Sequence, residues 1–299
     1  MKSFLIKTLI ILIILISCKS TDQQEHIEYN TDSFKINYPD TSHTLKVKKI
    51  FYNVPSPLEM SKILQRSNAI FQRNLIYPYT EVYKFTSTPQ QALLLGLYGS
   101  DLAYVRLFEQ IQLALNYITA IKTLFEALEV PYEQGAKSIE RLEKNINNKD
   151  SLLKTITETF TIADNYFKEI GKGNIATLVL LGGWIETLYL SSNGIDYNDS
   201  ANNEIIQRIG EQKLSLSNLI ELIKIYPDDK TLQNFLPKLL ELKLIYDEVK
   251  INHKSSEIIT DTINKTTIIK NISDVFISKE TFEKIKLFSQ NLREEIIKI

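Results

Sequence analysis

Apolar residues recur every three or four positions over most of this chain, which is the spacing of an amphipathic helix. Each stripe is expected to be buried in a shared core. Gly171 directly follows one stripe and is expected to end that helix. Pro237 lies inside another, where it would kink the helix or delay its start. The stripes cover residues 102–128, expected as one long central helix, and residues 152–170, 216–226 and 232–249.

Capping signals mark where several helices begin. Residues 56–59 (Ser-Pro-Leu-Glu) place a cap, a first-turn proline and a third-position glutamate in order, and residues 88–91 (Thr-Pro-Gln-Gln) repeat the device with glutamine. Ser278 is expected to cap a final helix. Ile277 and Phe282 have the spacing of a hydrophobic staple around that cap.

Two stretches have a different pattern. Residues 45–52 read as a short extended segment, and the region near 256–277 is rich in β-branched residues that alternate loosely, which is typical of a small hairpin or ribbon. No 34-residue repeat is present, although Leu-Leu-Gly-x-aromatic occurs at 94–98 and again at 180–184. The expected fold is therefore mostly α: an irregular bundle of about eight helices with a small β-hairpin before the C-terminal helix.

The amino terminus indicates an exported lipoprotein. Lys2 and Lys7 precede a nine-residue uncharged run at 8–16, and Ser17 and Cys18 follow it. This run is shorter than the about 20 helical residues that span a bilayer, which favours a cleaved signal over a plain membrane helix beginning at Phe4. The expected organisation is a signal peptide at 1–17, a lipidated Cys18 with a flexible tether at 18–44, and one helical domain with a β appendage at 45–299.

Composition limits the partners and the chemistry. The chain has 35 basic and 36 acidic residues, and this balance argues against nucleic acid as a partner. Cys18 is the only cysteine, so no disulfide is expected. With His26 and His43 in the tether, His253 stands alone in the body, and neither a histidine metal site nor a Ser-His-Asp arrangement has its parts. No cofactor is expected. The predicted location is the cell envelope, lipid-anchored in the outer membrane and facing the periplasm or the surface.

Three segments carry a resemblance to a known family. Residues 53–59 (Asn-Val-Pro-Ser-Pro-Leu-Glu), 95–104 (Leu-Gly-Leu-Tyr-Gly-Ser-Asp-Leu-Ala-Tyr) and 182–186 (Gly-Gly-Trp-Ile-Glu) look like segments of a family of helical lipoproteins from Bacteroidetes-type bacteria. The similarity runs from about Tyr52 to the end. That family has no assigned activity, so the resemblance implies a fold and a location but no functional residue.

Two isolated acids are the candidate chemistry of the body. Asp101 is the only charged residue between Lys84 and Arg106, and Glu186 is the only one between Lys172 and Asp196. One interpretation is a polar pocket between two central helices, in which both acids face a ligand, because a desolvated carboxyl group is a common feature of functional sites. The candidate ligand-binding residues are Asp101, Tyr104, Trp184, Glu186 and Tyr189.

The structural alternatives are simpler. Asp101 would belong to the first turn of a helix beginning near Ser100, where the helix dipole favours it, and Glu186 would lie at a pocket edge or face solvent. Alternatively, Arg106 or Arg141 pairs with one acid inside the bundle. The glycines inside the same apolar segments let two helices approach closely, mark breaks in the helices or admit a ligand to the backbone; they are Gly96, Gly99, Gly182 and Gly183.

The preferred function is a non-enzymatic binding or scaffolding module held at the membrane by its lipid, with an unidentified envelope protein or small ligand as partner. The alternative is a small-ligand receptor or an enzyme that uses Asp101 and Glu186. Two carboxylates in one concave, aromatic-lined pocket would favour the alternative. Carboxylates that are locked to an arginine would count against it.

Overall fold

The computed structural model of the protein describes residues 69–253, 257–261, 266–270 and 273–298, all within one compact unit of the chain. The predictions for the signal peptide, Cys18, the tether, the extended stretch at 45–52 and the capping box at 56–59 fall on residues outside this described part.

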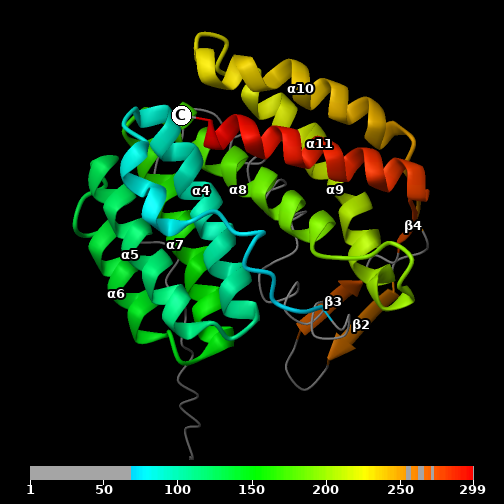
Figure 1. Cartoon of the computed structure of the whole chain (residues 1–299), viewed down its shortest axis with the longest axis horizontal. Coiled ribbons are helices and arrows are strands. Elements are labelled where there is room, and N and C mark those ends of the chain that lie inside the picture. Colours follow the sequence, from blue (N-terminus) through cyan, green and yellow to red (C-terminus); the bar gives the residue numbers. More distant parts are fainter. Residues whose placement is uncertain (1–68, 254–256, 262–265, 271–272, 299) are drawn as a thin grey trace, which may run out of the picture. The chain divides into compact units, whose positions relative to one another are not determined.

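The described residues are mostly helical, with a small β element before the last helix, as predicted (Figure 1). The elements are η2 (Tyr79–Lys84), α4 (Thr88–Leu107), α5 (Ile111–Ala127), α6 (Gly135–Lys144), α7 (Lys149–Glu169), α8 (Gly173–Asn193), η3 (Ser200–Asn202), α9 (Asn203–Ile223), α10 (Lys230–Asp247), β1 (Lys250–His253), β2 (Glu257–Asp261), β3 (Thr266–Lys270), β4 (Ser273–Phe276) and α11 (Lys279–Ile297).

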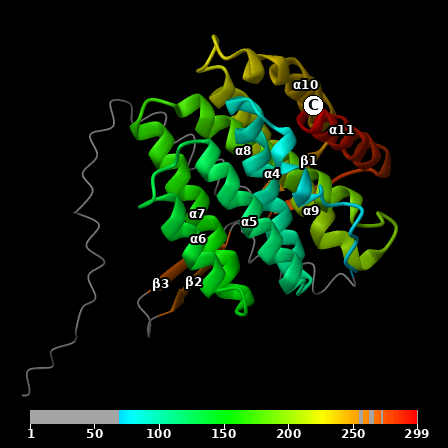
Figure 2. The same ribbon diagram turned by 60° about the vertical axis from the view of Figure 1, so that its left-hand side comes forward.

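Helices α4 and α8 form the centre of the bundle. Helices α5, α6 and α7 stand together on one side of this pair, and α9, α10 and α11 lie on the other (Figures 1 and 2). Both central helices are buried nearly all round, because each is covered from both sides. Helix α8 is also long and apolar enough to cross a membrane, but most of its length is buried inside the protein, which is the behaviour of a core helix.

Glycines bring α4 and α8 into backbone contact. A Cβ atom on Gly96 would lie 1.9 Å from the carbonyl oxygen of Val179, and one on Gly182 would lie 2.1 Å from that of Leu93. The two Leu-Leu-Gly segments therefore pack against each other across the central pair. The expectation of close helix packing is confirmed for Gly96 and Gly182, whereas Gly99 makes room for the Phe160 ring of α7.

Helices α7 and α4 end in the same backbone motif, but only the end of α7 has a glycine that the sequence analysis recognised. Gly171 ends α7 with φ of +74°, and the bonds from Gly171 N–H to Lys168 and from Lys172 N–H to Phe167 form a Schellman motif. The same motif ends α4, with Glu109 in the left-handed conformation (φ 60°). Its two bonds run from Glu109 N–H to Arg106 and from Gln110 N–H to Val105.

Two expectations about this part of the chain are wrong. The stripe at 102–128 is not one long helix but the end of α4 and the whole of α5, because the chain turns at Glu109. Glutamate is not typical of left-handed positions, so Glu109 does not indicate a helix end. The apolar spacing continues across the turn and predicted one helix. Asp101 does not lie in a first turn near Ser100, because α4 begins at Thr88 and Asp101 sits in its second half.

Helix starts agree more closely. Ser278 caps α11, and its side chain accepts a hydrogen bond from the Thr281 N–H, as predicted. The capping box of α4 lies one residue earlier than expected, with Ser87 as the cap and Gln90 at its third position. Pro237 lies within α10 and so does not delay its start.

The β element is confirmed and begins somewhat earlier than expected, at Lys250. Strand β1 pairs antiparallel with β4, and β2 pairs antiparallel with β3. The register runs from Lys250 opposite Phe276 to His253 opposite Ser273, and from Glu257 opposite Lys270 to Asp261 opposite Thr266.

The packing of α4 against α8 predicts a contrast between two glycines. Gly96→Ala should lower the free energy of unfolding by about 1–3 kcal/mol despite the better helix propensity of alanine, because its Cβ meets rigid backbone. Gly183→Ala is the matched control, since its Cβ would lie 3.3 Å from the nearest atom, the oxygen of Gly96. Urea denaturation measures both. Equal stability of the two variants would contradict the close contact.

Candidate functional site

The two isolated acids meet on the side of the central pair that faces α11. Asp101 comes from α4 and Glu186 from α8, and neither side chain is exposed. Arg293 of α11 binds Glu186 through Nε, at 3.0 Å from Oε1 and 2.7 Å from Oε2. The Arg293 guanidinium lies 4.3 Å from the ring centroid of Tyr189 and 5.9 Å from that of Tyr77. We call these five residues the carboxyl cluster.

One proton belongs to this cluster. Burial and the neighbouring charge of Glu186 raise the pKa of Asp101 well above its usual range. Burial also raises the pKa of Glu186, but there the Arg293 charge opposes the effect. Asp101 Oδ1 is buried without a hydrogen-bond partner among the described residues, and the Glu186 charge disfavours a second carboxylate beside it, so we expect one of the two groups to be protonated. Because Arg293 binds Glu186, the proton resides on Asp101, leaving one carboxylate opposite one guanidinium.

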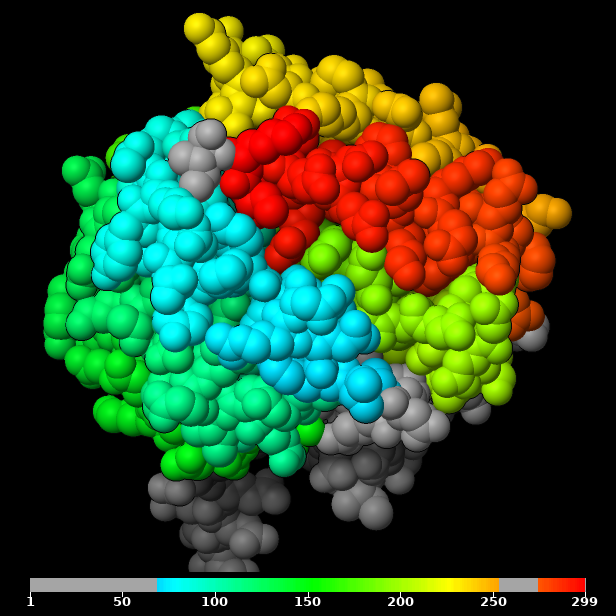
Figure 3. All heavy atoms as spheres, viewed as in Figure 1, coloured from blue at the N-terminus to red at the C-terminus, as the bar shows by residue number. Residues whose placement is uncertain are grey.

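The carboxyl cluster also holds an irregular part of the backbone. Residues 72–78 form no helix or strand, yet they pass over buried parts of the bundle and need partners for their amide and carbonyl groups. The light blue residues at the start of the described chain lie beside α11, red in Figure 3. Side chains bond these groups: Tyr104 accepts from the N–H of Gln72 (3.1 Å), and Arg293 donates to the carbonyl of Leu75 (3.0 Å). At Tyr77, Asp101 accepts from the N–H (3.1 Å) and Tyr117 donates to the carbonyl (2.6 Å). Tyr98 donates to the carbonyl of Pro78 (2.8 Å).

The expected arginine partners were the wrong ones. Arg141 pairs with Glu158 of α7, away from both acids. Arg106 is buried in the last turn of α4, where the helix dipole favours a cation, and its Nε and Nη1 have no hydrogen-bond partner among the described residues. Arg293 takes the role instead. It is 107 residues from Glu186 in the chain, so no local pattern linked the two.

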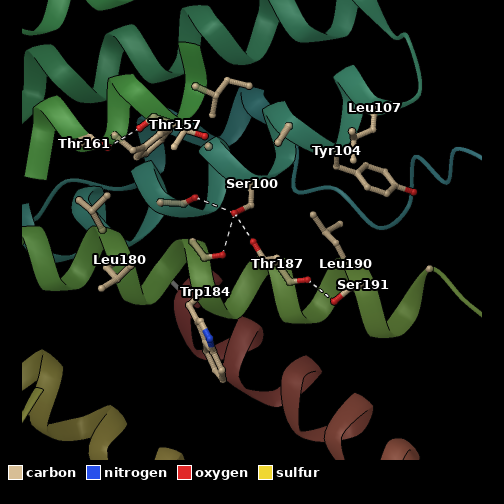
Figure 4. A pocket seen from close by; sticks show the side chains of 18 of the residues that line it. Ser100, Tyr104, Leu107, Thr157, Thr161, Leu180, Trp184, Thr187, Leu190 and Ser191 are labelled. Atoms are coloured by element: carbon tan, nitrogen blue, oxygen red, sulfur yellow. Dashed lines mark hydrogen bonds between the residues drawn. The ribbon is translucent and has the colours of Figure 1, made fainter. Parts of the chain in front are cut away.

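A cavity lies on a different side of the central pair, where α4 and α8 meet α7 (Figure 4). Its volume is about 270 Å³. Each helix contributes residues three or four positions apart, which places them on one face. We call it the α4/α7/α8 cavity. Its described lining consists of Ala69, Gly96, Gly99, Ser100, Ala103, Tyr104, Leu107, Phe108, Ile156, Thr157, Phe160, Thr161, Asp164, Ala176, Val179, Leu180, Gly183, Trp184, Thr187, Leu190, Ser191, Gly194 and Ile195.

The polar groups of this cavity are mostly bonded within the protein. Ser100 Oγ donates to the carbonyl of Gly183 at 2.9 Å and lies 3.1 Å from Thr187 Oγ1, which links α4 to α8 across the wall (Figure 4). Thr161 and Ser191 each donate to the carbonyl four residues earlier, at 2.9 and 2.7 Å. The rest of the wall is mainly apolar, so the cavity suits an apolar molecule better than a polar one.

The five candidate residues are thus divided between two places. Asp101, Glu186 and Tyr189 belong to the carboxyl cluster, whereas Tyr104 and Trp184 line the α4/α7/α8 cavity. The Trp184 ring points away from Ser100, and its N–H donates to Ser215 of α9 at 3.3 Å (Figure 4). Ser100 and Thr187 were not among the site residues predicted from the sequence. Ser100 precedes Asp101 and Thr187 follows Glu186, so each points in a different direction around its helix from the acid beside it.

No metal centre is assembled in the described part of the chain, where no three His, Cys, Asp or Glu side chains gather closely enough to hold an ion. The described lining of the cavity includes one charged residue, Asp164, which forms an ion pair with Lys168.

Comparison of this chain with protein-family models, with curated proteins and with solved structures finds no match. The function must therefore be argued from the residues and their geometry.

The proton on Asp101 predicts a pH dependence. The native state retains this proton above the ordinary pKa of 3.8, where the unfolded state releases it. The free energy of unfolding therefore falls as pH rises from about 4 toward the raised pKa, by up to about 1.4 kcal/mol per pH unit. Asp101→Asn keeps an acceptor for the Tyr77 N–H and a donor for Glu186, so it should fold and lose the part of this slope that Asp101 contributes.

Urea denaturation between about pH 5 and pH 8 measures the effect. Asp228→Asn, at an exposed aspartate, is the matched control and should keep the slope of the parent protein. A constant difference between parent and Asp101→Asn across that pH range would show that Asp101 is ionised in the folded protein.

Proposed function

We propose that this protein is a lipid-anchored cell-envelope protein whose helical body binds a small apolar molecule in the α4/α7/α8 cavity. The main support for the proposal is the cavity, which has a volume of about 270 Å³ and a mainly apolar wall. Apolar cavities of about 150 Å³ already bind benzene-sized molecules.

The apolar wall supports occupancy by an apolar molecule. Each Å² of apolar surface that a ligand and the wall remove from water contributes about 25 cal/mol. The exposed side chains of Thr157 and Thr161 place part of the wall at the surface of α7, where a ligand can enter. A ligand that fills the space gains part of this free energy.

A binding role without catalysis agrees with the position of the acids. Asp101 and Glu186 do not belong to the cavity lining. Glu186 is held by Arg293, and Asp101 bonds the backbone of residues 72–78. Neither carboxyl group faces a space where a substrate would react, which favours a structural role for both.

The proposed binding predicts uptake of a rod-shaped apolar fluorophore, 1,6-diphenyl-1,3,5-hexatriene, by the protein with Cys18→Ala and no lipid. Its fluorescence should rise on binding and saturate. Ala103→Phe, which fills the cavity, should weaken binding at least about tenfold, because the ring excludes the probe. Ala127→Phe makes the same change at an exposed position of α5 and should bind as the parent does. Absence of binding to the parent would refute the proposal.

The anchor is tested separately. Cys18→Ala in the full chain should move the protein from the membrane fraction to the soluble fraction, because the acyl chains on Cys18 provide the attachment. Ser20→Ala is a neighbouring control that should leave the protein in the membrane fraction. Membrane recovery of the Cys18→Ala protein, or a mature chain that begins at another residue, would contradict a lipid anchor.

A further inference from the structure

The shape of the α4/α7/α8 cavity identifies a ligand class. Along α8 the lining residues run from Ala176 to Ser191 at every third or fourth position, and along α4 from Gly96 to Leu107. At 1.5 Å per residue these walls are about 22 Å and about 17 Å long. The lining residues therefore trace a space that is elongated along both helices. An elongated apolar space matches an extended chain better than a compact ring system.

The chemistry of the wall favours a hydrocarbon chain. The hydroxyl groups of Ser100, Thr161 and Ser191 already donate to backbone carbonyls. No Lys or Arg is among the described lining residues, so nothing there would neutralise a carboxylate or a phosphate. Asp164 adds negative charge at the wall, although Lys168 pairs with it. The part of the ligand inside the cavity is therefore apolar and uncharged.

From these two features we infer that the cavity takes a single unbranched acyl or alkyl chain, with any polar head group left outside. This inference rests on the proposed binding of an apolar molecule and narrows it to one shape. The chain could come from the protein's own lipid at Cys18 or from a membrane lipid. Residues 19–68 reach on the order of 150 Å when extended, so the length of chain permits both sources.

Chain shape is tested by competition against bound diphenylhexatriene on the Cys18→Ala protein. Straight-chain alcohols from 1-hexanol to 1-dodecanol should displace the probe, with roughly fourfold tighter binding per added methylene until the chain fills the cavity. Cyclododecanol has the same number of carbons as 1-dodecanol and the same hydroxyl group. It should bind at least about tenfold more weakly, since a ring that leaves two methylenes outside already loses this much.

The outcomes separate the two claims. Equal displacement by 1-dodecanol and cyclododecanol, or displacement that does not change with chain length, would overturn the inference and leave apolar binding intact. Failure of diphenylhexatriene to bind the parent would remove the proposed function and the inference together. Ala127→Phe should reproduce the parent's preference, and Ala103→Phe should lose it.

A thiol placed in the cavity identifies the source of the chain. Ala103→Cys introduces a reactive thiol in a protein whose only natural cysteine is Cys18. Protection from N-ethylmaleimide in intact membranes that is lost with Cys18→Ala assigns the chain to the protein's own anchor. Protection of the Cys18→Ala form by phospholipid vesicles assigns it to a membrane lipid. Free reaction in both forms would overturn the inference.

Discussion

The backbone contact between α4 and α8 is the constraint on which the rest of the described structure depends. Gly96 and Gly182 place a helix carbonyl where a side chain would otherwise stand, so the two apolar segments lie directly against each other. Interior glycines weaken an isolated helix by about 1 kcal/mol each. Here that cost is offset by burial, because the central pair is covered on both sides by α5–α7 and α9–α11.

This contact gives the central pair two unlike sides. On the side toward α11, the two isolated acids come together, and Arg293 supplies the balancing charge. On the side toward α7, the Phe160 ring packs against Gly99, whereas the small side chain of Ala103 lines the α4/α7/α8 cavity. The carboxyl cluster and the α4/α7/α8 cavity therefore lie on different sides of the central helices. We assign a structural role to the cluster and ligand binding to the cavity.

The carboxyl cluster helps to hold residues 72–78 against the bundle. Residues 72–78 have no regular secondary structure, and buried backbone groups without partners are expensive. Asp101 and Arg293 provide a bond each, and three tyrosine hydroxyls provide the others. This accounts for three buried tyrosines, Tyr98, Tyr104 and Tyr117, whose rings pack in the core while their hydroxyls bond this segment. A buried ion pair adds little net stability, but it fixes where this segment lies.

The sequence by itself determined the helical class, the positions of several helices and the β element, because apolar spacing, capping residues and Gly171 act over a few residues. It also singled out the two isolated acids and the paired glycine segments. Only the tertiary structure decided what these residues do. The partner of Glu186 comes from the last helix, and the left-handed turn at Glu109 has no local signature. Whether a set of small residues packs flat or leaves a cavity depends on three helices meeting, a long-range contact that no window of sequence contains.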